Sequence, residues 1–172
     1  MTGIVTIIRH FVAILLLPFV MTILVPRWLM SGYAQSDTRW IDGTLGATFG
    51  RVAGLAILFL GLSLFSWCIA LFARVGRGTL APWDPTKHLV VVGPYRFVRN
   101  PMISAVLIIL MGESLLLGSR VVALWAFGFF IINALYFRLL EEPGLEQRFG
   151  DEYRRYKAAV PRWIPRAKPW NV

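Results

Sequence analysis

Four long apolar segments constrain the fold of this chain more than any other feature. They span residues 4–25, 52–73, 101–117 and 121–140, and the second contains no charged residue. About 20 apolar residues are enough for a helix to cross the hydrocarbon core of a bilayer. Because no water is available there, every backbone N–H and C=O group must be paired within its segment, which favours helices. We therefore predict an all-α, polytopic membrane helix bundle with about four transmembrane helices.

The last segments predict how the bundle ends. Only residues 118–120 separate the third and fourth segments, so the two are expected to form a C-terminal helical hairpin. In the following residues 143–158, apolar and aromatic side chains recur every three or four positions among charged ones. This pattern is typical of an amphipathic helix at a membrane surface. We expect a single domain, with N-terminal helices in 1–75 and the functional core in 76–166.

The composition agrees with a membrane protein and argues against a nucleic-acid partner. Hydrophobic residues make up 57% of the chain and charged residues 16%, whereas soluble domains average roughly 45–50% and about 25%. The net charge of +9 comes mainly from basic residues in the loops and the tail, where topology and anionic lipid headgroups account for them. The chain has one cysteine, Cys68, and one histidine outside the first apolar segment, His88, so no metal site is expected.

The basic residues also predict an orientation. With a cytoplasmic N-terminus, Arg27, Arg39, Arg51 and Arg120 are the outer ones among the 18 Lys and Arg residues, which leaves 14 inside. Such a bias follows the positive-inside rule. We expect an integral, multi-pass protein with both termini and the amphipathic helix in the cytoplasm. The bacterial cytoplasmic membrane is favoured over the endoplasmic reticulum.

Two polar clusters flank the predicted hairpin. The first is the basic, proline-bracketed loop 93–101, which leads into the third apolar segment, and the second is Glu141-Glu142, where the fourth ends. A tight turn between antiparallel segments would bring both clusters to one membrane face. Pro101 suits the first turn of a helix, whose free N–H groups favour an anionic ligand. Residues 87–92 are suited to an extended segment whose backbone contacts a planar ligand such as adenine. An ordinary cytoplasmic connector is the alternative.

The two glutamates leave more than one role open. Adjacent helical positions point about 100° apart, so Glu141 and Glu142 cannot both face one ligand group. One of them could bind a ligand while the other forms a salt bridge, with Arg138 four residues before Glu142 as a candidate partner. A solvated helix end with a surface ion pair is the alternative.

Three further charged residues have competing interpretations. Arg99 could clamp a carboxylate or a phosphate, whereas Arg96 is expected to reach toward lipid phosphates. Glu113 lies inside the third apolar segment, where acidic residues are usually functional. Its alternative is a pair with Arg120 near the outer interface.

Residues 88–101 resemble the signature of the isoprenylcysteine carboxyl methyltransferase family, which contains the pattern L-V-x-x-G-P-Y-x-x-x-R-H-P-x-Y. The closing pattern of that family, E-E-…-F-G-x-x-Y-x-x-Y-…-V-P, is resembled by residues 141–161. Related phospholipid N-methyltransferases share the double glutamate. The resemblance covers roughly residues 76–166. Asn100 stands where the family usually has histidine, Ile103 where it often has tyrosine, and Phe137 in the place of an arginine that contacts the acceptor.

This resemblance implies an integral membrane methyltransferase that uses S-adenosylmethionine and needs no metal. The cofactor would lie at the cytosolic face, between the signature loop and the last helices. Carried over by position, the cofactor-binding residues are those of the loop, those of the helix start and the double glutamate: Lys87, His88, Leu89, Val90, Tyr95, Asn100, Pro101, Met102, Ile103, Glu141 and Glu142.

The methyl acceptor is left open. A carboxylate acceptor is already ionised and needs only to be positioned, for which Arg99 and Arg138 are the candidate catalytic residues. An amine acceptor would need a base, with Glu142 or His88 as candidates. We expect a lipophilic small molecule, a lipidated substrate or a membrane lipid that enters from the bilayer. The alternatives are a non-catalytic membrane adaptor or assembly protein, and a related membrane reductase, for which the chain lacks a dinucleotide-type glycine fingerprint.

Overall fold

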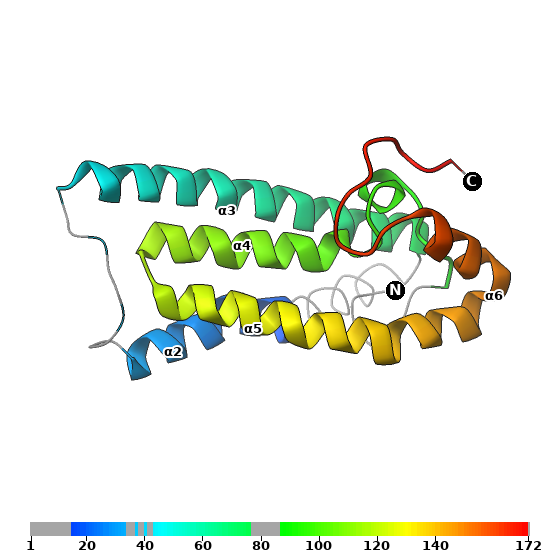
Figure 1. Cartoon of the computed structure of the whole chain (residues 1–172), viewed down its shortest axis with the longest axis horizontal. Coiled ribbons are helices and arrows are strands. Elements are labelled where there is room, and N and C mark those ends of the chain that lie inside the picture. The colour runs from blue at the N-terminus through cyan, green and yellow to red at the C-terminus, as the bar shows by residue number, and fades with distance from the viewer. Residues whose placement is uncertain (1–14, 34–36, 38–39, 41–42, 77–86, 172) are drawn as a thin grey trace, which may run out of the picture.

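The computed structural model describes residues 15–33, 37, 40, 43–76 and 87–171, and within these ranges the chain is all-helical without a strand. Figure 1 shows α3, α4 and α5 side by side, with α2 along α5 and α6 continuing from the end of α5. The elements are η1 (Leu15–Leu24), α2 (Val25–Gly32), α3 (Leu45–Leu71), η2 (Phe72–Gly76), η3 (Gly93–Arg96), α4 (Pro101–Leu117), α5 (Arg120–Tyr136), η4 (Phe137–Glu141) and α6 (Glu142–Ala159).

The predicted all-α fold is confirmed, and α4 has the bounds predicted from the sequence. The first helical run does not end at Pro26, however, but continues through α2 to Gly32. Pro26 lies just after the junction of η1 and α2, where Leu24 keeps a helical backbone, so the run passes through the proline. The part of the first predicted segment before Leu15 lies outside the described residues.

α3 begins seven residues earlier than the hydropathy pattern indicated. The side-chain oxygen of Thr44 accepts a hydrogen bond from the N–H group of Ala47 at 3.1 Å, which caps the helix start. Such a cap satisfies a backbone donor that has no partner within the helix. The start of α3 is therefore set by its cap, and the apolar stretch begins inside the helix.

The predicted hairpin between α4 and α5 is present, and its turn explains its shortness. Gly118 takes the left-handed backbone conformation with φ 67°, and Ser119 caps α5 by accepting from the N–H group of Val122 at 3.2 Å. A left-handed glycine commonly ends a helix at low cost. Among the described residues Glu113 and Arg120 form no ion pair with each other.

Two helical runs are long and apolar enough to cross a membrane, Leu45–Gly76 and Arg120–Ala159, and Pro101–Leu117 is a shorter apolar helix. Large apolar side chains cover the outside of the long runs, such as Phe59 at 74% exposed and Leu124 at 70% exposed. An extended apolar exterior of this kind suits lipid rather than water. Four membrane crossings remain a prediction.

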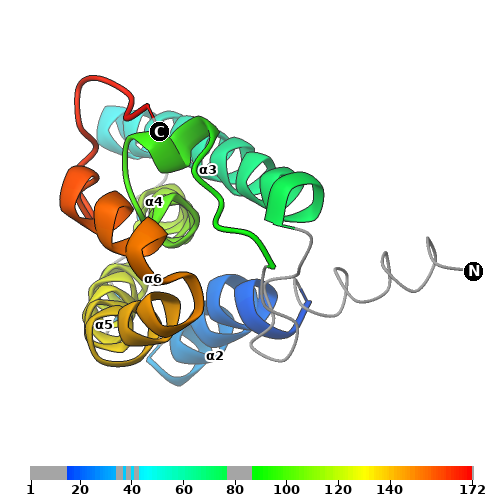
Figure 2. The same cartoon turned by 90° about the vertical axis from the view of Figure 1, so that its right-hand side faces the viewer.

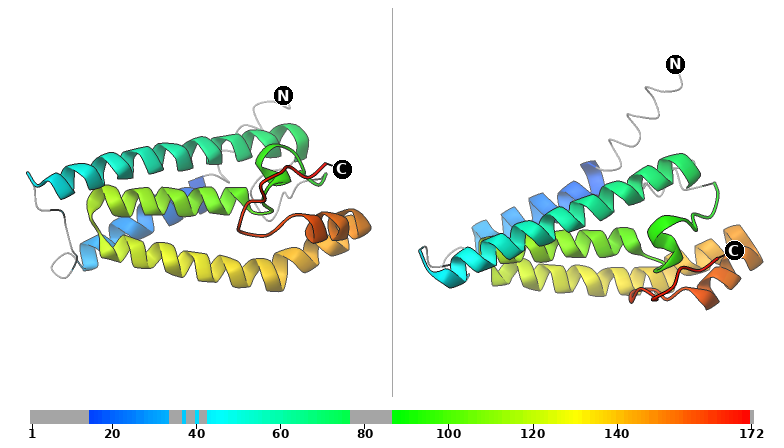
Figure 3. Two further views of the ribbon diagram at one scale, coloured as in Figure 1. Left: turned by 45° about the horizontal axis from the view of Figure 1, so that its top comes forward. Right: turned by 90° about the horizontal axis from the view of Figure 1, so that it is seen from above.

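Among the helices that the structure describes, α3 and α4 pack most closely, and Figure 3 shows them side by side from two directions. A Cβ atom added at Gly54 would lie 2.5 Å from the backbone nitrogen of Leu116, and one at Gly112 would lie 2.7 Å from that of Leu58. Small residues let membrane helices approach to backbone contact. The two helices therefore form a rigid pair, against which α5 and η1 pack.

Candidate functional site

The loop before α4 and the double glutamate meet at one end of the bundle. In the end-on view of Figure 2 this loop, α6 and the C-terminal tail lie together over the end of α4. The Arg99 Nη1 atom lies 3.0 Å from Glu142 Oε1, and the Tyr156 hydroxyl donates a 2.7 Å hydrogen bond to the carbonyl oxygen of Tyr95. The hairpin thus brings together the two clusters that the sequence separates.

Glu142 is the charged centre of this end. Its side chain is 5% exposed and contacts three cations. Arg162 donates from Nε to Oε1 at 2.6 Å and from Nη2 to Oε2 at 2.8 Å, and Lys157 Nζ lies 3.3 Å from Oε2. Burial raises the pKa of this carboxyl, but the hydrogen bond from Arg162 and the charges of Arg99 and Arg162 outweigh it and leave the pKa below its ordinary value. Glu142 is therefore an ionised anchor for basic side chains.

Glu141 has different surroundings, although it is the adjacent residue. It is half-buried, and its carboxylate interacts through a hydrogen bond with Tyr136, five residues earlier. The intervening η4 is a π-helix, in which hydrogen bonds link residues five apart, and such turns are frequent at functional sites. This local widening aligns Tyr136 with Glu141. The two carboxylates therefore have separate partners, as expected for adjacent helical positions.

The predicted ion pair between Arg138 and Glu142 is wrong. Arg138 is exposed and makes no ion pair with any residue that the structure describes. Residues four apart share a face in an α-helix, but both lie around the π-helical η4, which rotates them out of register. Arg138 thus keeps its charge available at the surface.

The loop from Lys87 to Val90 divides into an exposed and a buried part. Lys87 and His88 are exposed, and their N–H groups donate to the carbonyl oxygen of Gly76 at 2.8 and 3.4 Å. Val90 is buried in a cluster with Cys68 and Tyr95. Leu89 lines a small cavity of about 200 Å³ together with Val75, Val91, Val92, Glu152 and Trp170.

Tyr95 is a packing residue of the loop. Only 6% of it is exposed, and its ring stacks on Phe72 with the ring centroids 5.7 Å apart. Its carbonyl group, which accepts from Tyr156, links the loop to α6. The ring of Tyr95 therefore fixes the loop on the end of α3, whereas its backbone fixes the loop on α6.

The start of α4 holds polar donors without partners. Asn100 precedes the helix but makes no side-chain cap, and within the described part of the chain neither its Nδ2 atom nor the Nε atom of Arg99 has a hydrogen-bond partner. Pro101 is buried, and Met102 and Ile103 pack partly against the core. Buried donors are normally paired, so this end of α4 is suited to accept an oxygen-bearing group.

The C-terminal tail completes the site, which no local sequence pattern indicates. Residues 160–171 run back along the loop, with backbone hydrogen bonds from Arg99 to Pro161, from Arg166 to Phe97 and from Trp170 to Arg96. Arg96 was expected to reach toward lipid phosphates. Its Nε atom instead donates a hydrogen bond to the Trp170 carbonyl oxygen at 2.8 Å.

Lys157 and Arg162 are the charged residues that sequence reasoning missed. The sequence signal that could have pointed to Arg162 is its position directly after Val160-Pro161 of the closing pattern. Its contact with Glu142, however, spans 20 residues. No periodicity encodes a contact of that separation, because the tail must first fold back.

These observations define an all-helical protein with two helical runs of membrane-spanning length and a polar site where its apolar helices end. A family model described as phospholipid methyltransferase matches residues 49–152. An uncharacterized protein of Haemophilus influenzae is 40% identical over 63 residues, which are 37% of this chain and 100% of that protein. No solved structure matches the chain. Because the family model covers more than half of its length, the chain belongs to the phospholipid methyltransferase family and is a membrane methyltransferase.

Proposed function

We propose that the protein transfers a methyl group from S-adenosylmethionine to a lipophilic acceptor at the cytoplasmic face of a bacterial membrane. The observation that carries this proposal is the meeting of the loop before α4 with the double glutamate, through the 3.0 Å contact of Arg99 and Glu142. In a chain of a methyltransferase family, this junction joins the loop to the double glutamate, the two segments to which the resemblance assigns the cofactor.

The residues at the junction fit the polar groups of the cofactor. The donors without partners, Asn100 Nδ2 and Arg99 Nε, suit its carboxylate at the start of α4, where the helix dipole also favours an anion. Glu141, half-buried and free of the cation cluster, suits its ammonium group. The backbone around Leu89 and Val91, which lines the small cavity, suits the adenine ring.

The chain's own residues have mainly a positioning role. When bound, the sulfonium cofactor supplies an activated methyl group, so the protein needs to hold the acceptor in line with it and exclude water. Arg138 is exposed and pairs with no described residue, so it is the better candidate to hold an anionic acceptor. Arg99 pairs with Glu142, and its Nε atom is assigned above to the cofactor carboxylate, so it is the weaker candidate for the acceptor.

An amine acceptor would need a base, and of the two candidates, Glu142 and His88, the structure disfavours Glu142. Glu142 is tied to three cations and its pKa is lowered, so it is a weak proton acceptor. His88 is exposed at the site's edge and remains the candidate. The printed family name refers to phospholipids, which supports a lipid acceptor alongside an isoprenylcysteine-type carboxylate.

Titration of the purified protein with S-adenosylmethionine tests the proposal. We expect saturable binding by the unmodified protein and binding about tenfold or more weaker for Glu141→Gln, because a buried charged hydrogen bond is lost. Glu146→Gln is the matched control, since Glu146 pairs with Lys157 at 2.6 Å outside the proposed pocket. No binding by the unmodified protein would favour an adaptor role, and equal binding by Glu141→Gln would refute this placement of the cofactor.

Transfer of a labelled methyl group into a lipid extract identifies the acceptor. Label recovered in phospholipid headgroups indicates an amine acceptor, and base-labile label indicates a carboxyl ester. Arg138→Ala should reduce transfer to a carboxylate acceptor while leaving cofactor binding unchanged. A reductase would produce no labelled lipid at all.

A further inference from the structure

The small cavity at the polar end is closed on one side by the C-terminal tail. It has a volume of about 200 Å³, and its walls come from η2, the loop before α4, α6 and the tail. Pockets that hold a whole drug-sized ligand measure about 300–1,000 Å³, so this cavity has room for one part of the cofactor. The adenine ring, to which we assign it, is such a part.

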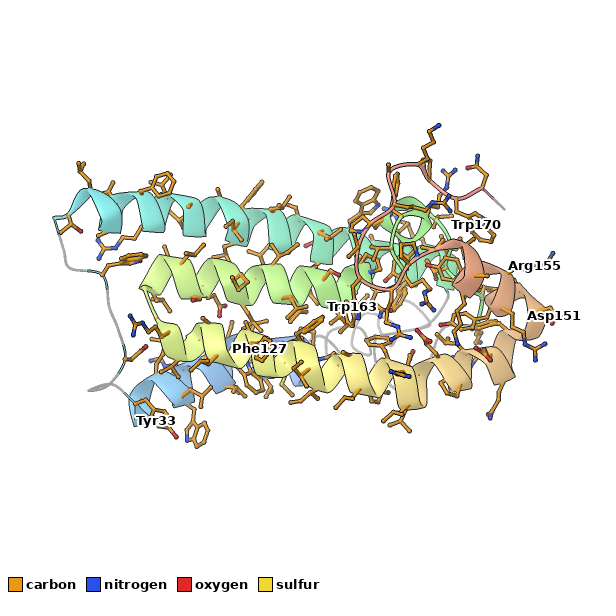
Figure 4. All side chains as sticks on the ribbon, viewed as in Figure 1. Tyr33, Phe127, Asp151, Arg155, Trp163 and Trp170 are labelled. Atoms are coloured by element: carbon orange, nitrogen blue, oxygen red, sulfur yellow. The ribbon has the colours of Figure 1, made fainter. Side chains whose placement is uncertain are left out.

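Trp170 is the residue that the tail contributes to this cavity. The other walls are aliphatic, apart from the side chain of Glu152, so among the described lining residues Trp170 alone is aromatic. Residues 167–169 are exposed, whereas Trp170 is half-buried and its ring lies 5.7 Å from that of Tyr156, measured between centroids. Figure 4 shows Trp170 near α6, well apart from Trp163 of the same tail. The indole therefore packs on α6 and borders the cavity at the same time.

Arg96 fixes the position of Trp170 by bonds to its backbone. The N–H group of Trp170 donates to the Arg96 carbonyl oxygen at 2.9 Å, and Arg96 Nε donates to the Trp170 carbonyl oxygen at 2.8 Å. Arg96 Nη2 also donates to the side-chain oxygen of Asn171. In Figure 2 the end of the tail accordingly lies beside η3, which contains Arg96. Because a guanidinium offers a rigid fork of donors, it fixes two successive tail residues at once.

We propose that Trp170 is a cofactor-binding residue that covers one face of the adenine ring, and that Arg96 is the positioning residue that holds it there. The inference rests on the proposed function, since it adds a residue to the same site. Trp170 lies outside residues 49–152, which the family model matches, and outside residues 76–166, which carry the sequence resemblance. The proposed wall therefore comes from a part of the chain that neither likeness covers.

An aromatic wall adds a contact that aliphatic walls do not give. Stacking of a base on an aromatic side chain typically strengthens binding about tenfold. The tail reaches the cavity through exposed residues and is held there by a few hydrogen bonds, so it can release Trp170 without unpacking a helix. The dissociation rate of the cofactor should therefore depend on how firmly Arg96 holds the tail.

Two substitutions that differ in aromaticity test the wall. Trp170→Phe keeps an aromatic ring, whereas Trp170→Leu keeps an apolar side chain without one. Calorimetric titration of the purified full-length protein with S-adenosylmethionine should give binding about tenfold weaker for Trp170→Leu, and within about threefold of the unmodified protein for Trp170→Phe. Lys168→Ala, an exposed change on the same tail, should leave binding unchanged. Equal weakening by Phe and Leu would mean that Trp170 only packs, and would overturn the proposal.

Fluorescence gives a readout that a purely structural role would not change. Adenine that stacks on an indole quenches its emission, so S-adenosylmethionine should quench the unmodified protein, and Trp170→Phe should bind it with a smaller quench. Trp28→Phe is the control, because Trp28 is 71% exposed on α2, and it should keep the quench that depends on Trp170. An unchanged quench in Trp170→Phe would contradict the contact. This comparison decides the matter even if Trp170→Leu fails to fold by thermal unfolding.

A double-mutant cycle tests the role of Arg96. Arg96→Ala removes both side-chain donors and leaves the backbone bond to Trp170, so binding should weaken toward that of Trp170→Leu, mainly through faster dissociation in stopped-flow measurements. Arg96→Lys should restore part of the loss. If Arg96 acts through Trp170, Arg96→Ala causes no further loss in Trp170→Leu. An additive loss would give Arg96 a separate contact and overturn its positioning role.

These outcomes are distinguishable from failure of the proposed function. No binding of S-adenosylmethionine by the unmodified protein would refute the proposed function, and this inference would fall with it. Saturable binding that weakens in Glu141→Gln but not in Trp170→Leu would keep the proposed function and overturn this inference alone.

Discussion

The α3–α4 pair and the polar end of the molecule are held together by opposite means. Along the pair, glycines bring two backbones into contact, as at Gly54 and Gly112. At the polar end, one carboxylate, that of Glu142, gathers Arg99, Lys157 and Arg162 from three separate segments.

This difference shows what each region tolerates. A close backbone contact has no room to relax, so added volume separates the helices. An ion cluster is instead sensitive to charge and pH. The α3–α4 pair therefore provides the rigid part of the helix bundle, while the ion cluster positions the loop and the tail that form the site.

The largest expected effect is in the helix pair. Gly112→Leu introduces a side chain where a Cβ atom would lie 2.7 Å from the Leu58 nitrogen, and should destabilise the protein by about 3 kcal/mol or more. Gly128→Leu on α5 is the control, because a Cβ atom there meets nothing within 4 Å. Thermal unfolding in detergent measures both. Equal midpoints for the two variants would contradict the rigid pair.

Glu142→Gln should have the next largest effect. It leaves Arg99, Arg162 and Lys157 without their shared counter-charge, and breaking a buried charge cluster typically costs about 3–5 kcal/mol. Glu146→Gln, which removes a partner of Lys157 only, should cost at most about 1 kcal/mol. Proteolysis at the C-terminal tail should increase in Glu142→Gln alone. An intact, resistant tail would show that the backbone hydrogen bonds hold it without the cluster.

The pH dependence follows from the same carboxylate and should be smaller. Because the pKa of Glu142 in the folded protein is lowered from 4.5, its stabilisation is fully present above that value and is lost as the pH falls through the folded-state pKa. The unfolding midpoint should therefore change little from neutral pH down to about 5 and fall below that. The difference in unfolding midpoint between the unmodified protein and Glu142→Gln should become smaller at acidic pH. A difference in midpoint that stays constant at low pH would mean that groups other than Glu142 cause the pH dependence of stability.

The smallest expected effect is at the opposite end of the helix bundle, at the start of α5. Ser119 is 1% exposed, caps α5 and donates to Asp37 Oδ2 at 2.6 Å, so Ser119→Ala should cost about 1 kcal/mol. Ser63→Ala should cost only a few tenths of that, because the exposed Ser63 hydroxyl bonds only within its own helix. Thermal unfolding with both variants measures the difference. No difference would mean that α5 begins correctly without its cap.

Hydropathy and turn residues predicted much of the fold. The bounds of α4, the hairpin at Gly118 and the amphipathic character of α6 follow from local patterns, because each depends on residues near in sequence. The bounds of α3 and α2 were less accurate, since the cap at Thr44 begins α3 before its apolar stretch, and the first helical run continues past Pro26 to Gly32. The kink at Gly150, with φ 54°, has no hydropathy signal.

The candidate site was predicted as a meeting of two clusters, without its internal contacts. The sequence by itself determined that apolar helices bring the loop near Asn100 and the double glutamate to one end, because the turn between α4 and α5 is too short for any other arrangement. Only the tertiary structure decided that Glu142 anchors three cations while Glu141 is left free of them, and that the tail lies against the loop. Those choices depend on a π-helical turn and on contacts 15 or more residues apart, which local patterns do not encode.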